Sequence, residues 1–174
     1  MPGLQFRDAC TTDLEAIREL TLSAYNEYAT LMPAHWDRYR QAILGTLADV
    51  KPAEQIVAEQ DESLVGSVLL YPAGTVFHTS AGNPVTLAYP EIRLLAVLPA
   101  ARGRGIGQAL VRECIRRARF AGATTITLHT TDAMRVAMRM YERMGFVRAP
   151  ELDFHPAEDL TIKGYRLDLD PSAA

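Results

Sequence analysis

The sequence is poor in several features that mark particular classes of protein. Its 174 residues include only two cysteines, Cys10 and Cys114, which are too few for a disulfide framework. No cluster of His, Cys and Asp residues has the spacing of metal ligands, so we expect no metal. There is no run of about 18 apolar residues, and the N-terminus lacks the apolar core of a signal peptide. We therefore expect a cytoplasmic protein with no membrane partner.

Lysine is scarce as well. Only Lys51 and Lys163 are present, and neither follows the Gly-x4-Gly pattern of a nucleotide-binding P-loop. The net charge of −3 provides no general attraction for nucleic acid, so no nucleic-acid partner is expected. Arginine carries most of the positive charge, and it is concentrated between Arg93 and Arg119, where seven arginines accompany one acid, Glu113. This local positive charge suits an anionic ligand.

Length and periodicity predict a single α+β domain over residues 1–170, followed by a frayed tail over 171–174. The expected element order is β-α-α-β-β-β-α-β-α-β-β. Helices are expected at 12–29, at 33–48, at 106–121, and after Asp132 with an apolar stripe from Val136 to Met144. Strands are expected at 4–7, 55–59, 64–71, 88–98, 125–130, 146–147 and 165–169, with loops at 72–86 and 149–160. Thr12 and Glu15 have the spacing of a capping box at the first helix.

The most informative stretch runs from Glu91 to Gln108. It reads as a strand that passes through a proline into an arginine-glycine loop and then into a helix. Glycines at 103, 105 and 107 remove Cβ atoms that would keep a ligand from the backbone, and the first amides of a helix have no intrahelical partner. Arg102 and Arg104 add positive charge, so we predict that the loop holds a pyrophosphate. The alternative is a glycine-rich turn that only joins the strand to the helix.

The order of the glycines separates this loop from a dinucleotide-binding loop. That fingerprint is Gly-x-Gly-x-x-Gly with an acid about 20 residues further on, whereas here the order is Gly-x-Gly-x-Gly and no acid follows at that distance. The stretch Arg102-Gly-Arg-Gly105-Ile-Gly107 instead has the form Arg/Gln-x-x-Gly-x-Gly/Ala. This form resembles the GNAT superfamily of acyl-CoA-dependent N-acyltransferases.

A second stretch, residues 134–146, supports the same resemblance. The family pattern is Asn-x-x-Ala-x-x-x-Tyr-x-x-x-Gly-Phe, and Ala137, Tyr141, Gly145 and Phe146 match it at the right spacing. Met134 stands where the family has Asn, a residue that commonly helps to hold the pantetheine or phosphate arm of the cofactor. The resemblance covers essentially the full chain. It implies a central mixed, mostly antiparallel sheet of about seven strands flanked by four helices.

The resemblance also implies acetyl-CoA as the co-substrate. Backbone groups of the central strand would bind its pantetheine, and the loop amides would bind its pyrophosphate. The implied cofactor-binding residues are Leu95, Ala96, Val97, Arg102, Gly103, Arg104, Gly105, Ile106, Gly107, Gln108, Met134 and Tyr141.

In the implied reaction an amine attacks the thioester directly, and three residues are candidates for moving protons. Tyr141, whose phenol is neutral at pH 7, could give its proton to the CoA thiolate. A tyrosine that is only packed in the core has the same sequence pattern. Glu91 or His129 could accept the proton of the amine. The structural alternatives are a Glu91 carboxylate paired with an arginine and a His129 bonded to a loop backbone. Neither acts as a base if water suffices.

Acceptor recognition is expected from the first two helices and from the loop at 149–160, because these flank the thioester in relatives. The candidates are Tyr28, Trp36, Glu91 and Phe154, where aromatic side chains with an acid could receive a cationic amine. The alternative is that the aromatic residues belong to the core. We expect an N-acetyltransferase for a small-molecule amine, with a protein N-terminal or lysine acetyltransferase and a non-catalytic acyl-CoA sensor as alternatives. A homodimer is common among relatives, but no feature of the sequence demonstrates one here.

Overall fold

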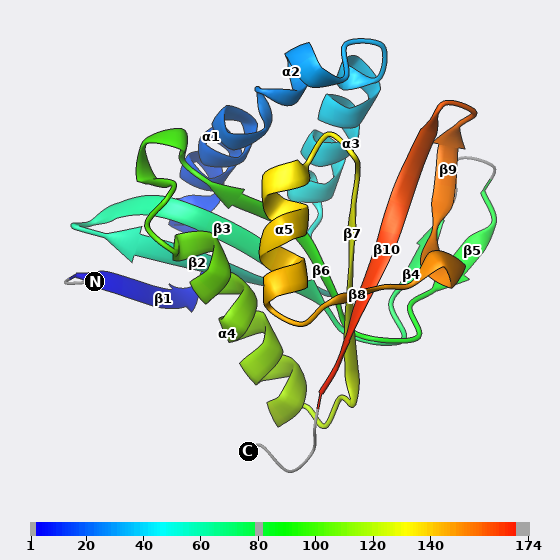
Figure 1. The fold of residues 1–174 in the computed structure, drawn as a ribbon. Coiled ribbons are helices and arrows are strands. Elements are labelled where there is room, and N and C mark those ends of the chain that lie inside the picture. The colour runs from blue at the N-terminus through cyan, green and yellow to red at the C-terminus, as the bar shows by residue number, and fades with distance from the viewer. Residues whose placement is uncertain (1–2, 79–81, 170–174) are drawn as a thin grey trace. The chain divides into compact units, whose positions relative to one another are not determined.

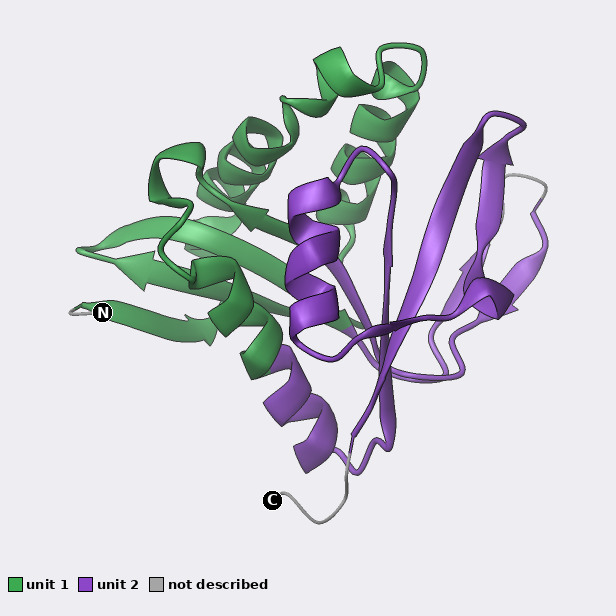
Figure 2. Cartoon of the chain, viewed as in Figure 1, with its two compact units in different colours: residues 1–70, 94–113 green, residues 71–93, 114–174 purple. Residues whose placement is uncertain are grey.

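The computed structural model of the chain describes residues 3–78 and 82–169. The chain divides into two compact units, one of residues 1–70 and 94–113 and the other of residues 71–93 and 114–174 (Figure 2). The division falls inside a strand, between Arg93 and Leu94, and inside a helix, between Glu113 and Cys114. The expected tail at 171–174 lies outside the described residues, and the single domain over 1–170 stays a prediction.

Unit 1 combines an antiparallel set of strands with three helices (Figure 1). Its strands are β1 (Leu4–Asp8), β2 (Glu54–Gln60) and β3 (Ser63–Tyr71, of which the last residue belongs to unit 2). Its helices are α1 (Leu14–Tyr25), α2 (Tyr28–Leu31) and α3 (Trp36–Ala48). The turn between β2 and β3 is a two-residue hairpin turn, in which Asp61 and Glu62 both have the positive φ that such a turn requires.

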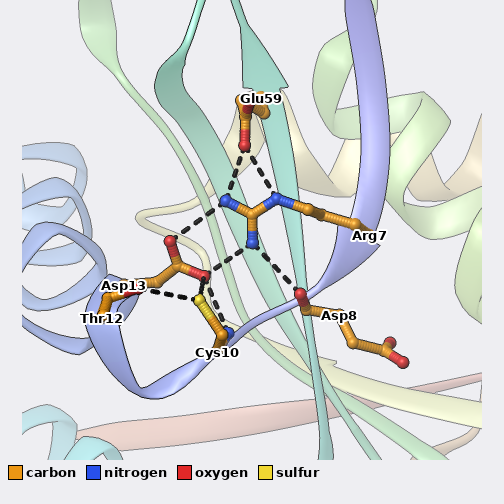
Figure 3. A network of polar contacts seen from close by, with 6 residues as sticks. All are labelled: Arg7, Asp8, Cys10, Thr12, Asp13 and Glu59. Atoms are coloured by element: carbon orange, nitrogen blue, oxygen red, sulfur yellow. Dashed lines mark hydrogen bonds and ion pairs between the residues drawn. The ribbon is translucent and has the colours of Figure 1, made fainter.

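An ion-pair network fixes the start of unit 1 (Figure 3). Arg7 on β1 donates from Nε to Glu59 on β2 at 2.8 Å and from Nη1 to Asp13 at 2.7 Å. The hydrogen bond from Arg7 lowers the pKa of Asp13 well below its usual range. Asp13 also accepts the backbone N–H of Cys10, so it caps the 3-10 turn Thr11–Asp13 that precedes α1. The predicted Thr12–Glu15 capping box is therefore wrong, because the capping box is formed by Cys10 and Asp13.

Unit 2 contains most of the remaining strands and the helix of the second sequence pattern. The helix is α5 (Arg135–Arg143), and β6 (Glu91–Val97) enters this unit with its first three residues. The other strands are β4 (Val76–His78), β5 (Pro84–Thr86), β7 (Thr125–Thr130), β8 (Val147–Arg148), β9 (Phe154–Ala157) and β10 (Leu160–Asp168). The start of β6 pairs parallel with β7, and β10 pairs antiparallel with β7, β8 and β9. The helix α4 (Ile106–Phe120) is shared by both units.

The α+β class is confirmed, while several details differ from the prediction. The described residues form a main sheet of eight strands, close to the seven expected, because β9 occupies part of the expected loop at 149–160, and a separate two-stranded sheet of β4 and β5 in the expected loop at 72–86. They form five α-helices rather than four, because a short turn after Tyr25 separates α2 from α1. The strand expected at 88–98 is shorter, at Glu91–Val97, and the last strand begins at Leu160 rather than at 165.

Two helix details are also corrected. Asp132 does not cap α5, since the residue at the cap is Met134 and the Asp132 carboxylate pairs with Lys163 at 2.6 Å. Val136 is expected on the apolar stripe of its helix, yet it is exposed. It lies at the N-terminal end of α5, where an apolar pattern no longer guarantees a covering neighbour. No helix within the described ranges is long and apolar enough to cross a membrane.

Candidate active site

The arginine-glycine loop lies in unit 1, between the 3-10 turn Pro99–Ala101 and α4. Gly103 and Gly105 both have φ of +75°, a left-handed conformation that side chains rarely adopt. A Cβ atom placed on either residue would find no other atom within 4 Å, so the protein leaves the space beside these glycines open. The loop runs directly into the first turn of α4, whose amides lack intrahelical acceptors. The loop therefore has the space and the donors that a pyrophosphate needs, and binding of the group there stays a prediction.

The two arginines of this loop have different surroundings. Arg102 donates to the carbonyl oxygen of Ala24 at 2.7 Å and pairs with Glu27 at 2.9 Å, so it fastens the loop to the end of α1. Arg104 is exposed, and no residue in the described part of the chain bonds or pairs with it. Of the two arginines predicted to bind phosphate, only Arg104 has a guanidinium that is not engaged by another described residue.

The predicted pantetheine-binding segment forms the end of β6 in unit 1. Leu94 precedes it with φ of +46°, a conformation that is rare for a leucine and that interrupts the regular pleat of the strand. The carbonyl oxygen of Leu95 already accepts a hydrogen bond from the Tyr25 hydroxyl at 3.2 Å, Ala96 is buried, and Val97 is half-buried. The carbonyl of Leu95 retains a second lone pair for another donor.

Unit 2 brings the two candidate bases together. Glu91 at the start of β6 and His129 on β7 lie 3.3 Å apart, measured from Oε2 to Nδ1. Arg93, two residues after Glu91 on the same strand, places Nε 2.5 Å from Oε1 of Glu91. Only 2% of the Glu91 surface is exposed, so the carboxylate is buried between two basic side chains. We call Glu91, Arg93 and His129 the charge cluster.

Burial and charge oppose each other in this cluster. Burial alone would raise the pKa of Glu91. The contact with His129 and the charge of Arg93 together outweigh the effect of burial, so the pKa lies below that of an ordinary glutamate. Burial would likewise lower the pKa of His129, but the contact with Glu91 outweighs it and the pKa is raised. The cluster therefore favours an ionised glutamate beside a protonated imidazole.

Hydrogen bonding leads to the same protonation state. Nε2 of His129 lies 2.9 Å from the carbonyl oxygen of Leu152, which can only accept, so Nε2 carries a proton. Nδ1 is buried and faces the carboxylate of Glu91 at ion-pair distance, although the angle is too poor for a regular hydrogen bond. A lone pair on Nδ1 would be repelled by the negative carboxylate of Glu91, whereas a proton on Nδ1 is attracted to it. Glu91 is thus paired with an arginine and His129 is bonded to a loop backbone, as in the two structural alternatives considered for these residues.

Aromatic rings flank the charge cluster within unit 2. The guanidinium of Arg93 lies 3.8 Å from the ring centre of Phe77, on β4. The ring of Phe154, on β9, contacts the imidazole of His129 at 5.3 Å between centres, and Phe154 is 48% exposed. Phe154 thus contacts a candidate base and also presents a surface to solvent, and its place in acceptor binding stays a prediction.

The second sequence pattern forms α5 and the turn after it. Tyr141 is buried, and its ring packs edge-on against Phe146, the last residue of the pattern, at 5.9 Å. Gly145 has φ of +92° and ends the helix, which explains the glycine in the pattern. Met134 begins α5 without any side-chain hydrogen bond to the helix end. A thioether is only a weak acceptor, so Met134 replaces neither the cap nor the polar contact that an Asn could supply.

The expected aromatic cluster forms in unit 1. Tyr25 contacts Tyr28 and Tyr39, with ring centres 5.7 and 5.9 Å apart, and Trp36 contacts Tyr39 at 6.5 Å. Tyr28 and Trp36, the two predicted acceptor-binding residues of this cluster, are half-buried. Burial raises the pKa of Tyr28, so its phenol stays neutral.

Two residues of interest were not singled out from the sequence. Arg93 was counted only as part of a basic segment, although its i, i+2 spacing from Glu91 on a strand places both side chains on one face. Arg40 stands one helical turn after Trp36 and lines the same pocket, and its i, i+4 spacing from Trp36 is the sequence feature that could have identified it.

Among residues 3–78 and 82–169, no group of three or more His, Cys, Asp or Glu side chains could hold a metal ion.

Comparison with known proteins identifies the family. Residues 14–146 match the model of the acetyltransferase (GNAT) family, which is more than half of the chain. The chain belongs to this family, as the two sequence patterns predict.

Individual relatives agree with the family match. The chain is 30% identical over 97 residues to mycothiol acetyltransferase of Thermomonospora curvata, covering 56% of this chain and 29% of that protein. It is 33% identical over 101 residues to human N-acetyltransferase 8B, covering 57% and 40%. The matches thus span well under two thirds of those relatives. The fold resembles that of a GNAT-family acetyltransferase from Brucella melitensis solved with acetyl-CoA, with a TM-score of 0.63, 23% identity, and coverage of 97% and 89%.

Proposed function

We propose that this protein is an N-acetyltransferase that moves the acetyl group of acetyl-CoA directly to a primary amine of a small molecule. The observation that carries the proposal is the open arginine-glycine loop before α4. Gly103 and Gly105 hold left-handed conformations with open space where a Cβ atom would lie, and Arg104 pairs with none of the described residues. Amides from Gly103 to Gln108 and the Arg104 guanidinium would hold the pyrophosphate. Acetyl-CoA, when bound, would supply an acetyl group activated as a thioester.

The charge cluster supports Glu91 as the group that takes the proton of the acceptor amine. An ammonium must lose a proton before its nitrogen can attack. His129 in its protonated state has no lone pair left, since Nε2 faces Leu152 and Nδ1 faces Glu91. The ionised carboxylate of Glu91 keeps unshared lone pairs beside its contacts to Arg93 and His129. Because Glu91 is buried, a water molecule would carry the proton to it.

Tyr141 is the proposed donor to the sulfur that leaves. A phenol is neutral at pH 7, so it still carries the proton that it can give to the nascent thiolate. Tyr141→Phe should lower turnover at least tenfold while sparing the affinity for acetyl-CoA, in keeping with general acid catalysis. Tyr89→Phe, an exposed tyrosine of the same unit, is the matched control. An unchanged turnover number would remove Tyr141 from the mechanism.

The small-molecule acceptor is supported by the crowded aromatic surface of α1 and α3 and by one relative. An extended peptide needs an open groove, whereas Tyr28 and Trp36 are packed against neighbouring rings. The name of the Thermomonospora relative refers to mycothiol rather than to a protein. A protein acetyltransferase remains the second candidate.

The test is a panel of small amines and N-terminal peptides, each incubated with the protein and acetyl-CoA. Free CoA thiol and N-acetylated product should appear together in equal amounts for one class of amine. A thermal shift with acetyl-CoA but no product from any amine would favour the non-catalytic sensor. No thermal shift with acetyl-CoA would overturn the proposal as a whole.

A further inference from the structure

A small pocket lies between α1 and α3 in unit 1. Its volume is about 320 Å³, within the range of sites that take small molecules. The lining residues are Leu22, Ser23, Asn26, Trp36 and Arg40. The first three come from the end of α1 and the turn after it, and the other two from successive turns of α3. This is the helical segment from which the sequence predicts acceptor recognition.

The polar side chains of this pocket have no partners in the part of the chain that the structure describes. The guanidinium of Arg40, the amide of Asn26 and the hydroxyl of Ser23 make no hydrogen bond or ion pair there. The nearest acids along the chain do not neutralise Arg40, since Glu27 pairs with Arg102 and Asp37 does not pair with Arg40. Ser23 and Asn26 are exposed and Arg40 is half-buried, so all three groups can exchange water for a ligand.

The chemistry of these groups selects an oxyanion. A guanidinium offers up to five N–H donors in a planar arrangement that matches carboxylate and phosphate, and no acceptor at all. Asn26 and Ser23 can donate to the same ligand. Trp36, held edge-on by Tyr39, adds a flat wall, and Leu22 adds an apolar surface. A cationic amine would be repelled by Arg40, so the amine itself does not bind beside it.

We propose that this pocket binds a carboxylate or phosphate group carried by the acceptor, with an aromatic or apolar part of the acceptor against Trp36. The inference rests on the proposed function only in calling the ligand an acceptor. It narrows the acceptor to an amine with an anionic group at its other end. It also replaces the expectation that an acid among these aromatic residues receives a cation.

The sequence provides a direct probe, because Trp36 is the only tryptophan of the chain. Tryptophan fluorescence is recorded while the protein is titrated with phenylacetate, phenyl phosphate, phenylacetamide and phenethylamine, with no acetyl-CoA present. Phenylacetate or phenyl phosphate should change the signal with saturation, and the stronger of the two identifies the preferred oxyanion. The neutral amide and the cation should bind at least tenfold more weakly.

Variants assign the effect to Arg40. Arg40→Gln should weaken oxyanion binding roughly ten- to a hundredfold, because a charge-assisted hydrogen bond is lost, and Arg40→Lys should restore part of it. Arg18→Gln, an exposed arginine on α1 outside the pocket, makes the same change of charge and should bind as the wild type does. Equal affinity in Arg40→Gln and the wild type, or no saturable signal with either oxyanion, overturns the proposal. Melting temperatures of the variants show that each is folded.

A second comparison ties the pocket to catalysis. The acetylation of 4-(aminomethyl)benzoate is compared with that of 4-(aminomethyl)benzamide, which differs only in the anionic group. The benzoate should have the higher kcat/KM, and Arg40→Gln should remove the difference. If both are acetylated equally well by the wild type, the pocket is not an acceptor site, although the proposed function stands. If oxyanions bind but no amine is acetylated, the pocket stands and the proposed function fails.

Discussion

The charge cluster of unit 2 and the pocket of unit 1 use arginine in opposite ways. In the cluster, Arg93 and His129 both contact Glu91, and the carboxylate is 2% exposed. In the pocket, Arg40 faces a cavity without a counter-charge from the described residues. The first arrangement fixes a protonation state before any ligand arrives. The second leaves a charge that is free to bind the proposed ligand.

From this difference we propose separate tasks for the two regions. The positive charges of Arg93 and His129 hold Glu91 ionised despite burial, so the carboxylate can accept a proton at neutral pH, while its lowered pKa makes it a weaker base than an ordinary glutamate. An unpaired arginine that contacts a small pocket contributes binding energy instead of proton transfer. Changes in the cluster should therefore alter turnover and its pH dependence, and changes in the pocket should alter affinity.

The largest expected effect comes from breaking the cluster at its centre. Glu91→Gln keeps the shape of the side chain but removes the proton acceptor and leaves Arg93 and His129 facing a neutral amide. We expect kcat to fall roughly 10²- to 10⁴-fold, the range for loss of a general base. Steady-state kinetics with the best acceptor of the panel measures this. The exposed Glu158→Gln is the control, and a kcat for Glu91→Gln within twofold of the wild type would show that water suffices.

His129→Gln sharpens the assignment within the cluster. The contact with His129 lowers the pKa of Glu91, so its loss should move the acidic limb of the kcat/KM profile to higher pH. At pH values above that limb, most of the activity should remain. A loss of about 10²-fold or more at every pH would instead identify His129 as the base.

The cluster should also leave a signature in stability against pH. The lowered pKa of Glu91 stabilises the fold fully above pH 4.5, the ordinary value, and the effect is lost as pH falls through the lowered pKa. The raised pKa of His129 stabilises fully below pH 6.5 and is lost as pH rises through the raised pKa. Urea unfolding should show both contributions in full between pH 4.5 and 6.5. A decline above pH 6.5 that persists unchanged in His129→Gln would contradict this.

The arginine-glycine loop repeats the contrast between paired and unpaired arginines on a smaller scale. Arg104→Gln should raise the KM for acetyl-CoA roughly tenfold, through loss of a charge-assisted phosphate contact, with little effect on the melting temperature. Arg102→Gln should chiefly lower stability, by about 1 to 2 kcal/mol, because its bonds to Ala24 and Glu27 are structural. Isothermal titration and thermal unfolding separate the two effects. The reverse pattern would mean that Arg102 is the phosphate ligand.

The smallest expected effect is at the uncapped start of α5. Met134→Asn introduces the residue of the family pattern at a helix N-cap and should stabilise the protein by about 1 kcal/mol. In a protein of this size that raises the melting temperature by roughly 2 to 4 °C. Asp132→Ala serves as control, since the carboxylate is 71% exposed and its pair with Lys163 should contribute less than about 1 kcal/mol. A Met134→Asn variant no more stable than the wild type would show that the backbone there does not accept a cap.

The sequence predicts the parts of the fold that depend on local pattern. The loop glycines, the turn at Asp61 and the end of α5 at Gly145 all need positive φ or a close approach, and each has a local signature. β4 and β9 escaped prediction because they are short, β4 follows a segment with Pro72 and Gly74, and β9 contains Pro156, so pairing with a neighbouring strand decides the conformation. The exposure of Val136 likewise depends on what packs on α5, which no single-helix pattern contains.

The candidate site could be predicted residue by residue, though not as a set of contacts. Glu91 and His129 were selected separately as rival bases, whereas the structure places them in contact through the parallel pairing of β6 with β7. The role of Arg40 depends on α1 lying against α3, a tertiary contact without a sequence motif. A sequence shows which residues could be catalytic or bind a ligand, whereas the residues that they contact depend on how strands and helices pack together.

The most direct test of the account is one set of steady-state kinetics on the wild type, Glu91→Gln and Arg40→Gln, with 4-(aminomethyl)benzoate and saturating acetyl-CoA. We predict a large fall in kcat with little change in KM for Glu91→Gln, and a rise in KM with little change in kcat for Arg40→Gln. A fall in kcat for Arg40→Gln together with unchanged turnover in Glu91→Gln would contradict the division between a paired catalytic cluster and an unpaired recognition pocket.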